Sequence, residues 1–203
     1  MILQNFIVFE GIDGAGTSTQ LKILQDKLRD KPAYFTCEPT ELETGRFLRK
    51  VLKGDIKLHP DTIARLFAAD RCEHLFGNNG ILELTQKGNL VVSDRYIFSN
   101  LAYQSNECGK ELPRALNASF PLPQIVFYFD LDPSISINRI HNRGVTEIYE
   151  KKEFLQKTRA QYLSIMEEYR DKTQIVFIDA EDSILNVSEK IWSIISELPI
   201  IKK

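Results

Sequence analysis

A glycine-rich segment near the start of the chain constrains its fold more than any other feature. Residues 6–9 read Phe-Ile-Val-Phe, a run typical of a buried strand, and residues 11–16 then supply three glycines. Glycine lets the backbone wrap closely around an anion, which backbone N–H groups and the N-terminus of a following helix can bind. The sequence therefore predicts a phosphate-binding loop between a strand and a helix, made of Gly11, Ile12, Asp13, Gly14, Ala15, Gly16, Thr17, Ser18 and Thr19.

The spacing of this loop fits the pattern GxxxxGK[ST] except at one position. Ser18 stands where a hydroxyl ligand of Mg²⁺ belongs, but Thr17 stands where the pattern requires lysine. That lysine neutralises phosphate charge during phosphoryl transfer, and losing one charge-assisted hydrogen bond costs roughly 1.5–3 kcal/mol. Lys22 is a poor substitute, because it lies more than a turn into the predicted helix. Either other cations replace the lysine, or the loop belongs to a weakened or inactive enzyme.

The rest of the chain alternates apolar runs with helical patterns. Further β-branched and aromatic runs occur at residues 33–35, 90–92, 125–129 and 175–178, and most lack polar alternation. Apolar residues recur at helical spacing over 21–28, 60–85, 150–169 and 184–198. This order predicts a single α/β domain over residues 1–203, with a doubly wound, parallel, five-stranded sheet flanked by helices. We expect weakly ordered segments at 40–45 and 142–147, which are short and polar.

Charge and cysteine content exclude several classes of protein. The formal net charge of −2 argues against a general nucleic-acid binder, which would carry a basic surplus. Three scattered cysteines show no metal-ligand spacing and indicate reduced thiols. The first residues lack the pattern of a signal peptide, and no apolar run approaches the ~18 residues of a membrane span. We therefore expect a cytoplasmic protein without membrane or nucleic-acid partners.

Several motifs together resemble the thymidylate kinases, P-loop enzymes that phosphorylate dTMP with ATP. The phosphate loop with its Phe-Glu prefix at 9–10 is similar to the family signature, and so is Glu-Pro-Thr at 38–40. The segments Leu-Phe-Ala-Ala-Asp-Arg at 66–71 and Ser-Asp-Arg-Tyr at 93–96 also match. The most specific stretch is Ser-Asn-Leu-Ala-Tyr-Gln at 99–104. The resemblance spans almost the whole chain and implies a P-loop NTPase-type fold with a short lid at about 139–152.

The acceptor side of the predicted site is nearly complete. Asp94 and Arg95 follow a predicted strand, so they should lie at its carboxyl end beside the phosphate loop. A carboxylate there can hold Mg²⁺ through water, and a guanidinium can grip a phosphate with its planar fork. We predict Ser18 and Asp94 as the metal site. The alternative for Asp94 and Arg95 is a structural ion pair.

The resemblance also implies contacts to the nucleoside. Phe67 would stack on thymine, and Arg71, four residues away on the same helix face, would bond its carbonyl. Tyr103 would close against the 2′ side of the sugar and favour deoxyribose. We expect Phe67, Arg71, Arg95 and Tyr103 to line one cavity. The predicted acceptor residues are Asp13, Pro39, Arg49, Phe67, Arg71, Arg95, Ser99, Tyr103 and Gln104.

The donor side departs from the family pattern. Members carry a catalytic arginine either in the loop, where this chain has Gly14, or in the lid, where Ile148 occupies the expected position. The remaining candidates are Arg139 and Arg143, which lie four residues apart and could face the phosphates or the adenine. We predict both as ATP-binding residues. The predicted catalytic set is Asp13, Asp94, Arg95 and Arg143.

Three hypotheses follow from these residues. The leading one is a kinase that transfers the γ-phosphate of ATP to dTMP, with Mg²⁺ and as a homodimer. The substitutions at Thr17 and Ile148 motivate the second, a weakened or non-catalytic nucleotide-binding homologue. The third is a kinase for another nucleoside monophosphate or for a deoxynucleoside.

Overall fold

The computed structural model of the chain describes residues 1–141, 148–149 and 151–202. Its centre is a parallel five-stranded sheet in the order β2-β3-β1-β4-β5. The strands are β1 (Ile2–Gly11), β2 (Ala33–Cys37), β3 (Leu90–Asp94), β4 (Leu122–Asp130) and β5 (Gln174–Asp179). Each contains one of the five predicted apolar runs, so the prediction of an α/β fold around a parallel sheet is confirmed.

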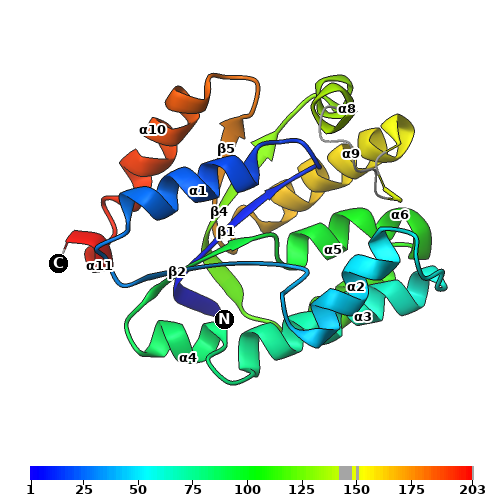
Figure 1. Cartoon of the computed structure of the whole chain (residues 1–203), viewed down its shortest axis with the longest axis horizontal. Coiled ribbons are helices and arrows are strands. Elements are labelled where there is room, and N and C mark those ends of the chain that lie inside the picture. The colour runs from blue at the N-terminus through cyan, green and yellow to red at the C-terminus, as the bar shows by residue number, and fades with distance from the viewer. Residues whose placement is uncertain (142–147, 150, 203) are drawn as a thin grey trace.

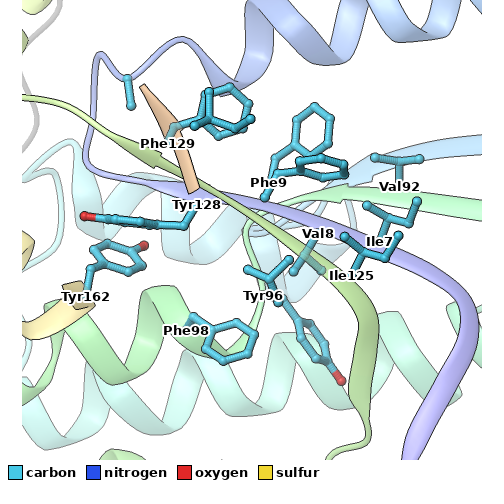
Figure 2. Packing of buried hydrophobic residues seen from close by; sticks show 14 of the residues in the cluster. Ile7, Val8, Phe9, Val92, Tyr96, Phe98, Ile125, Tyr128, Phe129 and Tyr162 are labelled. Carbon is cyan, nitrogen blue, oxygen red and sulfur yellow. The ribbon is translucent and has the colours of Figure 1, made fainter. Parts of the chain in front are cut away.

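Strand β1 is the central strand of the sheet, and it pairs with β3 on one side and with β4 on the other. Its residues Phe6 to Phe9 are fully buried, as expected for a strand covered on both faces. Side chains alternate across the sheet. Phe9 packs on Phe129 on one face, while Tyr128 packs on Tyr162 on the other, with ring centroids 5.3 Å apart in both pairs (Figure 2).

Helices cover both faces of the sheet (Figure 1). Helix α1 (Thr17–Lys27) and helix α10 (Ile184–Ile195) pack together on one face, and α4 (Ile81–Gln86) and α5 (Ile97–Tyr103) cover the other. Helix α9 (Lys152–Tyr169) packs along α5. The remaining helices are α2 (Glu43–Leu52), α3 (Pro60–Phe76), α6 (Ser105–Cys108), α7 (Glu111–Asn117), α8 (Pro133–His141) and α11 (Pro199–Lys202).

The prediction of one helix over residues 60–85 is wrong. Helix α3 ends at Phe76 and α4 begins at Ile81, because Gly77 is extended and Asn79 adopts a left-handed φ of 54°. A Cβ on Gly77 would lie 2.4 Å from the carbonyl oxygen of Glu73, so a glycine is needed where the chain leaves the helix. The run Gly-Asn-Asn-Gly at 77–80 is therefore a helix break.

The prediction of weak order at residues 40–45 is also wrong. Asp70 of α3 is buried and accepts hydrogen bonds from the backbone N–H of Thr40 (2.8 Å), the Thr40 hydroxyl (2.6 Å) and the Thr44 hydroxyl (2.6 Å). These polar residues serve a buried carboxylate rather than solvent, and helix α2 starts among them at Glu43. The other segment predicted to be weakly ordered, 142–147, lies outside the described residues.

The order of the strands brings three loops to one edge of the sheet. The chain leaves β1 towards β2 and β3 on one side and later returns to pair β4 on the other, so the winding reverses at β1. The carboxyl ends of β1, β2 and β3 lie in register, with Phe9 opposite Asp94 and Cys37 opposite the same residue. This edge is where a doubly wound sheet binds its ligand. Within the described residues, no helix has both the length and the apolar content to cross a membrane.

Candidate functional site

A cavity of about 390 Å³ opens at the carboxyl ends of β1, β2 and β3. The glycine loop forms one wall, and residues of α2, α3 and α5 form the others. Most of the residues predicted from the sequence line it. These are Ile12, Asp13, Gly14, Gly16, Thr17, Ser18, Pro39, Arg49, Phe67, Asp94, Arg95, Ser99, Tyr103 and Gln104.

The glycine loop has the backbone geometry that its composition predicts. Gly14 and Gly16 have left-handed φ values of 79° and 93°, which an L side chain rarely adopts. Gly11 has no room for a side chain, because a Cβ there would lie 2.8 Å from the carbonyl oxygen of Phe129. Gly16 directly precedes α1, so the loop delivers the N-terminus of that helix to the cavity. This arrangement suits a phosphate group.

Ser18 and Asp94, the two residues that we predict as a metal site, lie in contact beside the loop. The Ser18 hydroxyl donates to Oδ2 of Asp94 at 2.7 Å. The other carboxylate oxygen, Oδ1, is buried and has no hydrogen-bond partner among the described residues. No group of three or more potential metal-binding side chains occurs within the described part of the chain. A cation here would therefore depend on these two residues and on ligands from substrate and water.

Arg95 is held in the floor of the cavity. Its Nη2 donates to Oδ1 of Asp13 at 2.7 Å, and its Nη1 donates to the hydroxyl of Ser99 at 3.0 Å and to the carbonyl oxygen of Gly11 at 3.1 Å. Its φ of 73° lies in the left-handed region, which is unusual for a residue with a long side chain. The backbone is thus held in a strained conformation that directs the guanidinium between the loop and the cavity.

Tyr103 completes this cluster. Its hydroxyl donates to Oδ2 of Asp13 at 2.8 Å and accepts from the backbone N–H of Asp13 at 3.1 Å. Burial raises the pKa of Tyr103 well above its usual value, so the hydroxyl stays protonated. The guanidinium of Arg95 lies 5.2 Å from the ring centroid of Tyr103. Asp13 therefore joins the two side chains that face the cavity.

Glu10 and Tyr162 lie next to Arg95: Tyr162 contacts its guanidinium directly, and Glu10 binds Ser99, which Arg95 also contacts. The sequence analysis did not identify either as a site residue. Glu10 is fully buried, and its carboxylate accepts from the hydroxyls of Ser99 (2.7 Å) and Tyr162 (2.9 Å). Burial raises the pKa of Glu10 to about 7, although its hydrogen bonds and Arg95 lower it. The available signal was a carboxylate at the end of an apolar strand, since such a group needs partners when it is buried.

The far end of the cavity has an aromatic wall and a buried polar cluster. Phe67 and Glu38 line it, but Arg71 does not. Arg71 is 1% exposed and lies behind the wall, where its Nη2 donates to Oε2 of Glu38 at 2.6 Å. Its Nε has no partner among the described residues. The expectation that Arg71 lines the cavity is therefore wrong, because pairing with Glu38 holds it in the core, and its contact with a base stays a prediction.

Arg49 reaches the cavity from α2. Its Nη2 donates to the carbonyl oxygen of Pro39 at 2.5 Å and pairs with Glu41 at 3.0 Å. Its Nε is buried without a partner in the described part of the molecule. Arg49 and Arg95 are the two basic side chains that line the cavity within the described residues.

A second hollow of about 290 Å³ lies across the glycine loop, between α1 and α10. It is lined by Ala15 and Thr19 of the predicted loop and by Arg139 of α8. Arg139 donates to the carbonyl oxygens of Gly14 (3.3 Å) and Ala180 (3.1 Å), so it braces the loop on this side. The predicted residue Arg143 lies outside the described residues.

The described residues of the predicted lid segment include one aromatic side chain that the sequence analysis did not single out. Tyr149 lines the first cavity and stacks on Phe154, with ring centroids 4.9 Å apart. Its neighbour Ile148, at the position expected for a catalytic arginine, is 41% exposed. The backbone N–H of Ile148 donates to the carbonyl oxygen of Leu52 at 3.1 Å. An aromatic residue between glycine and charged residues was a weak signal, because its packing partners come from distant parts of the chain.

Comparison with known proteins shows which family the chain resembles. The family model described as thymidylate kinase matches residues 9–191. One relative is a protein of Treponema pallidum that is named as a thymidylate kinase. It is 43% identical over 195 residues, which cover 94% of each chain. A thymidylate kinase of Leptospira interrogans is 41% identical over 167 residues, covering 79% of this chain and 81% of its own.

The matched region includes the glycine loop, the strand ends and the helices that surround the first cavity. Its length and the level of identity agree with the resemblance that the sequence motifs indicate. The residues that line the cavity are also largely those expected of such a family. The chain belongs to the thymidylate kinase family.

Proposed function

We propose that this protein transfers the γ-phosphate of ATP to dTMP, giving ADP and dTDP. The observation that carries the proposal is the position of Arg95 between the phosphate loop and the cavity that ends at Phe67. A nucleotide with its base on Phe67 would direct its phosphate towards that guanidinium. Family membership supports the same reaction.

Arg95 would bind the phosphate of dTMP through its planar fork. Its carboxylate partner is Asp13, so the incoming phosphate would compete with that carboxylate for the Nη2 group. Asp13 would then be free to accept a hydrogen bond from the sugar, while Tyr103 keeps it in place. Arg49 would add a second positive charge on the acceptor side.

The donor phosphates would lie in the glycine loop, held by its backbone N–H groups and the N-terminus of α1. The second hollow, with Arg139 at its rim, is the proposed place of the adenine. Thr17 offers a hydroxyl where most such loops offer an ammonium group. Transfer then depends on positioning and on the remaining positive charges, which is compatible with the largely electrostatic nature of phosphoryl transfer.

The residues at the loop fit a divalent cation. Oδ1 of Asp94 is a buried acceptor without a donor in the described residues, and the Ser18 hydroxyl lies next to it. Mg²⁺ bound there would neutralise phosphate charge and align the donor. Ser18 would be a direct ligand, and Asp94 would orient its hydroxyl or hold water ligands.

Two further proposals concern the whole protein. We propose that it acts in the cytoplasm, since its three scattered cysteines are typical of reduced thiols. We also propose a homodimer, as the family resemblance implies. Equilibrium sedimentation at micromolar concentration measures the second directly, and a monomer would contradict it.

The experiment that tests the activity follows dTDP formation from dTMP, ATP and Mg²⁺ by chromatography. We expect turnover with dTMP that is lost when EDTA removes Mg²⁺. Arg95→Ala should raise the KM for dTMP by at least about a hundredfold, because it removes charged hydrogen bonds to the phosphate. Arg46→Ala, on the exposed side of α2, is the matched control and should leave the KM unchanged. Saturable binding of dTMP without any dTDP would contradict the proposal.

A further inference from the structure

Three side-chain oxygen atoms form a closed triangle next to the guanidinium of Arg95. They are Oε2 of Glu10, Oγ of Ser99 and Oη of Tyr162. Oε2 lies 2.7 Å from Oγ and 2.9 Å from Oη, and the two hydroxyl oxygens lie 2.8 Å apart. All three separations are hydrogen-bond distances. Because Glu10 and Tyr162 are fully buried, water offers these two groups no alternative partner, and the triangle has to be satisfied by its own protons.

The number of protons in this triangle depends on the charge of Glu10. If Glu10 is ionised, the two hydroxyl groups supply two protons for three contacts, so one pair of oxygens has no hydrogen atom between them. If Oε2 carries a proton, three O–H groups serve three contacts in one closed ring. Arg95 does not remove the shortage, because its Nη1 donates to Ser99 at 3.0 Å and to Tyr162 at 3.4 Å rather than to the carboxyl group.

The other oxygen of Glu10 is already engaged. Oε1 accepts from the backbone N–H groups of Tyr96 at 2.8 Å and of Ser99 at 3.3 Å, so the proton belongs on Oε2. Burial, which raises the pKa of Glu10 to about 7, favours the same protonated form. Geometry and burial therefore agree that Glu10 gains and loses a proton close to neutral pH.

Other ionisable groups surround this cluster from each neighbouring element. Three phenols stay protonated near neutral pH, because burial raises the pKa of each above its usual value; they are Tyr103 of α5, Tyr128 of β4 and Tyr162 of α9. The charged groups are Arg95, Asp13 of the glycine loop and Asp94 at the end of β3.

The proton on Glu10 changes the charge that a phosphate meets at Arg95. Nη2 of Arg95 pairs with Asp13 at 2.7 Å, so a neutral Glu10 leaves the guanidinium with this one carboxylate as a hydrogen-bonded partner. An ionised Glu10 adds a second negative charge, which contacts the guanidinium through Ser99. Such a charge is weakly screened in a buried site, so it opposes the approach of a phosphate dianion.

We propose that Glu10 is a positioning residue for the acceptor phosphate: its protonated form keeps the charge of Arg95 available, and an ionised Glu10 takes up a proton from the buffer when dTMP binds. The inference rests on the proposed function, in which Arg95 binds the phosphate of dTMP. Because the phosphate favours the protonated form, linkage requires that dTMP binds less tightly as the pH rises and that binding takes up a proton.

The first test measures the Kd of dTMP by titration calorimetry without ATP. A phosphate monoester has its second pKa near 6, so dTMP is largely a dianion throughout the range used. A roughly tenfold preference of the phosphate for protonated Glu10 gives about a fivefold rise in Kd between about pH 6.5 and pH 8.5. A Kd of the unmodified protein that does not rise over this range would overturn the proposal.

The variant Glu10→Gln separates charge from packing. Its amide oxygen accepts from the two backbone N–H groups, its amide nitrogen faces the two hydroxyls, and it is uncharged at every pH. We expect its Kd for dTMP to stay level over the same range and to be lower than that of the unmodified protein at pH 8.5. Glu189→Gln, an exposed substitution on α10, is the matched control and should keep the rise in Kd.

The second test measures proton uptake in the unmodified protein and needs no variant that might fail to fold. Calorimetry at pH 8 in two buffers of different ionisation enthalpy gives the number of protons bound with dTMP. We expect roughly half a proton, for the same tenfold preference. Thymidine, which lacks the phosphate, should give no uptake. Binding of dTMP without uptake, or with equal uptake by Glu10→Gln, would overturn the proposal.

A merely structural role for Glu10 predicts a different outcome. Glu10→Gln would then raise the Kd by the same factor at every pH, and this result would also overturn the proposal. Failure of the unmodified protein to bind dTMP at all would contradict the proposed function together with this inference. Tight binding of dTMP with a level Kd contradicts the inference alone, so the two failures are distinguishable.

Discussion

Thr17 is the residue at which this chain departs furthest from an ordinary phosphate loop. It begins α1 and lines the cavity beside the glycines. We expect Thr17→Lys to raise kcat by about ten- to a hundredfold, since it supplies a charge-assisted hydrogen bond worth roughly 1.5–3 kcal/mol in the transition state. Steady-state kinetics with varied ATP measures the effect.

The control for this prediction is Thr17→Gln, which adds length without charge and should give no comparable gain. A loss of activity in Thr17→Lys would mean that the threonine hydroxyl belongs to a rearranged donor site. In that case Thr17→Ser should retain most of the activity and Thr17→Val should not.

The burial of Glu10 predicts how the free energy of unfolding depends on pH. Its pKa is raised from 4.5 to about 7 by burial, so between these values the folded state binds more protons than the unfolded state. The contribution of Glu10 to the free energy of unfolding is therefore greatest below pH 4.5, and it is lost as the pH rises through about 7. The full change amounts to roughly 3 kcal/mol.

Urea unfolding of the unmodified protein and of Glu10→Gln at several pH values measures this effect. The difference between the two free energies of unfolding should change steadily between about pH 5 and pH 7.5, with the unmodified protein losing relative stability. Glu189→Gln, an exposed substitution on α10, serves as the control. A constant difference across that range would contradict the buried titration.

At this scale the sequence predicts which residue types surround the phosphate but not how they pair. The glycines and Ser18 could be found because the loop motif depends on neighbours in the chain, and Asp94 could be found because it directly follows a predicted strand. Arg71 could not be placed correctly, because its partners Glu38 and Asn117 are 33 and 46 residues away. Pairing over such distances is decided by the fold.

Among the secondary-structure elements, α2 depends on a single carboxylate for its position. Asp70 accepts three hydrogen bonds from Thr40 and Thr44, immediately before and within the start of α2. In Asp70→Asn the amide nitrogen either faces the N–H of Thr40 or displaces the two hydroxyls. We expect a loss of about 1–3 kcal/mol in the free energy of unfolding, because a buried donor loses its partner.

Hydrogen exchange gives a local measurement of the same effect. The backbone amides of residues 40–44 should exchange faster in Asp70→Asn than in the unmodified protein, while those of β1 change little. Glu73→Gln, an exposed position one turn along α3, is the control. Equal exchange at residues 40–44 in both proteins would show that Asp70 does not hold this segment.

The strands could be predicted better than the loops and helix ends. Buried parallel strands have a local signature of continuous apolar residues, and all five were located in this way. The break between α3 and α4 was missed, because apolar spacing continues on both sides of it. The glycines and asparagines at 77–80 contained the necessary signal, which the periodicity obscured.

For the whole molecule, we propose one cooperative domain centred on β1, which contacts helices on both faces of the sheet. The single tryptophan, Trp192, lies on α10 and packs against the core on the side away from the acceptor cavity. Urea transitions followed by Trp192 fluorescence and by circular dichroism should therefore coincide. Two separate midpoints would indicate independently unfolding parts.

Binding of dTMP gives a second test of whether the domain unfolds as one cooperative unit. At a dTMP concentration a hundred times its Kd, the free energy of unfolding should rise by about 2.7 kcal/mol. The fluorescence of Trp192 should report the full shift, although this residue lies outside the acceptor cavity. Thymidine, which lacks the phosphate, is the control and should give a much smaller shift at the same concentration.

The contact between Arg95 and Asp13 bears on selectivity among the many small anions of a living cell. Inorganic phosphate and sulfate carry charged oxygens like those of a nucleotide but have no base. Each would have to separate a compensated guanidinium–carboxylate contact while leaving the aromatic wall at Phe67 bare. A nucleotide would offset the same separation by covering that wall with its base, so we expect the Arg95–Asp13 contact to favour nucleotides over inorganic phosphate and sulfate.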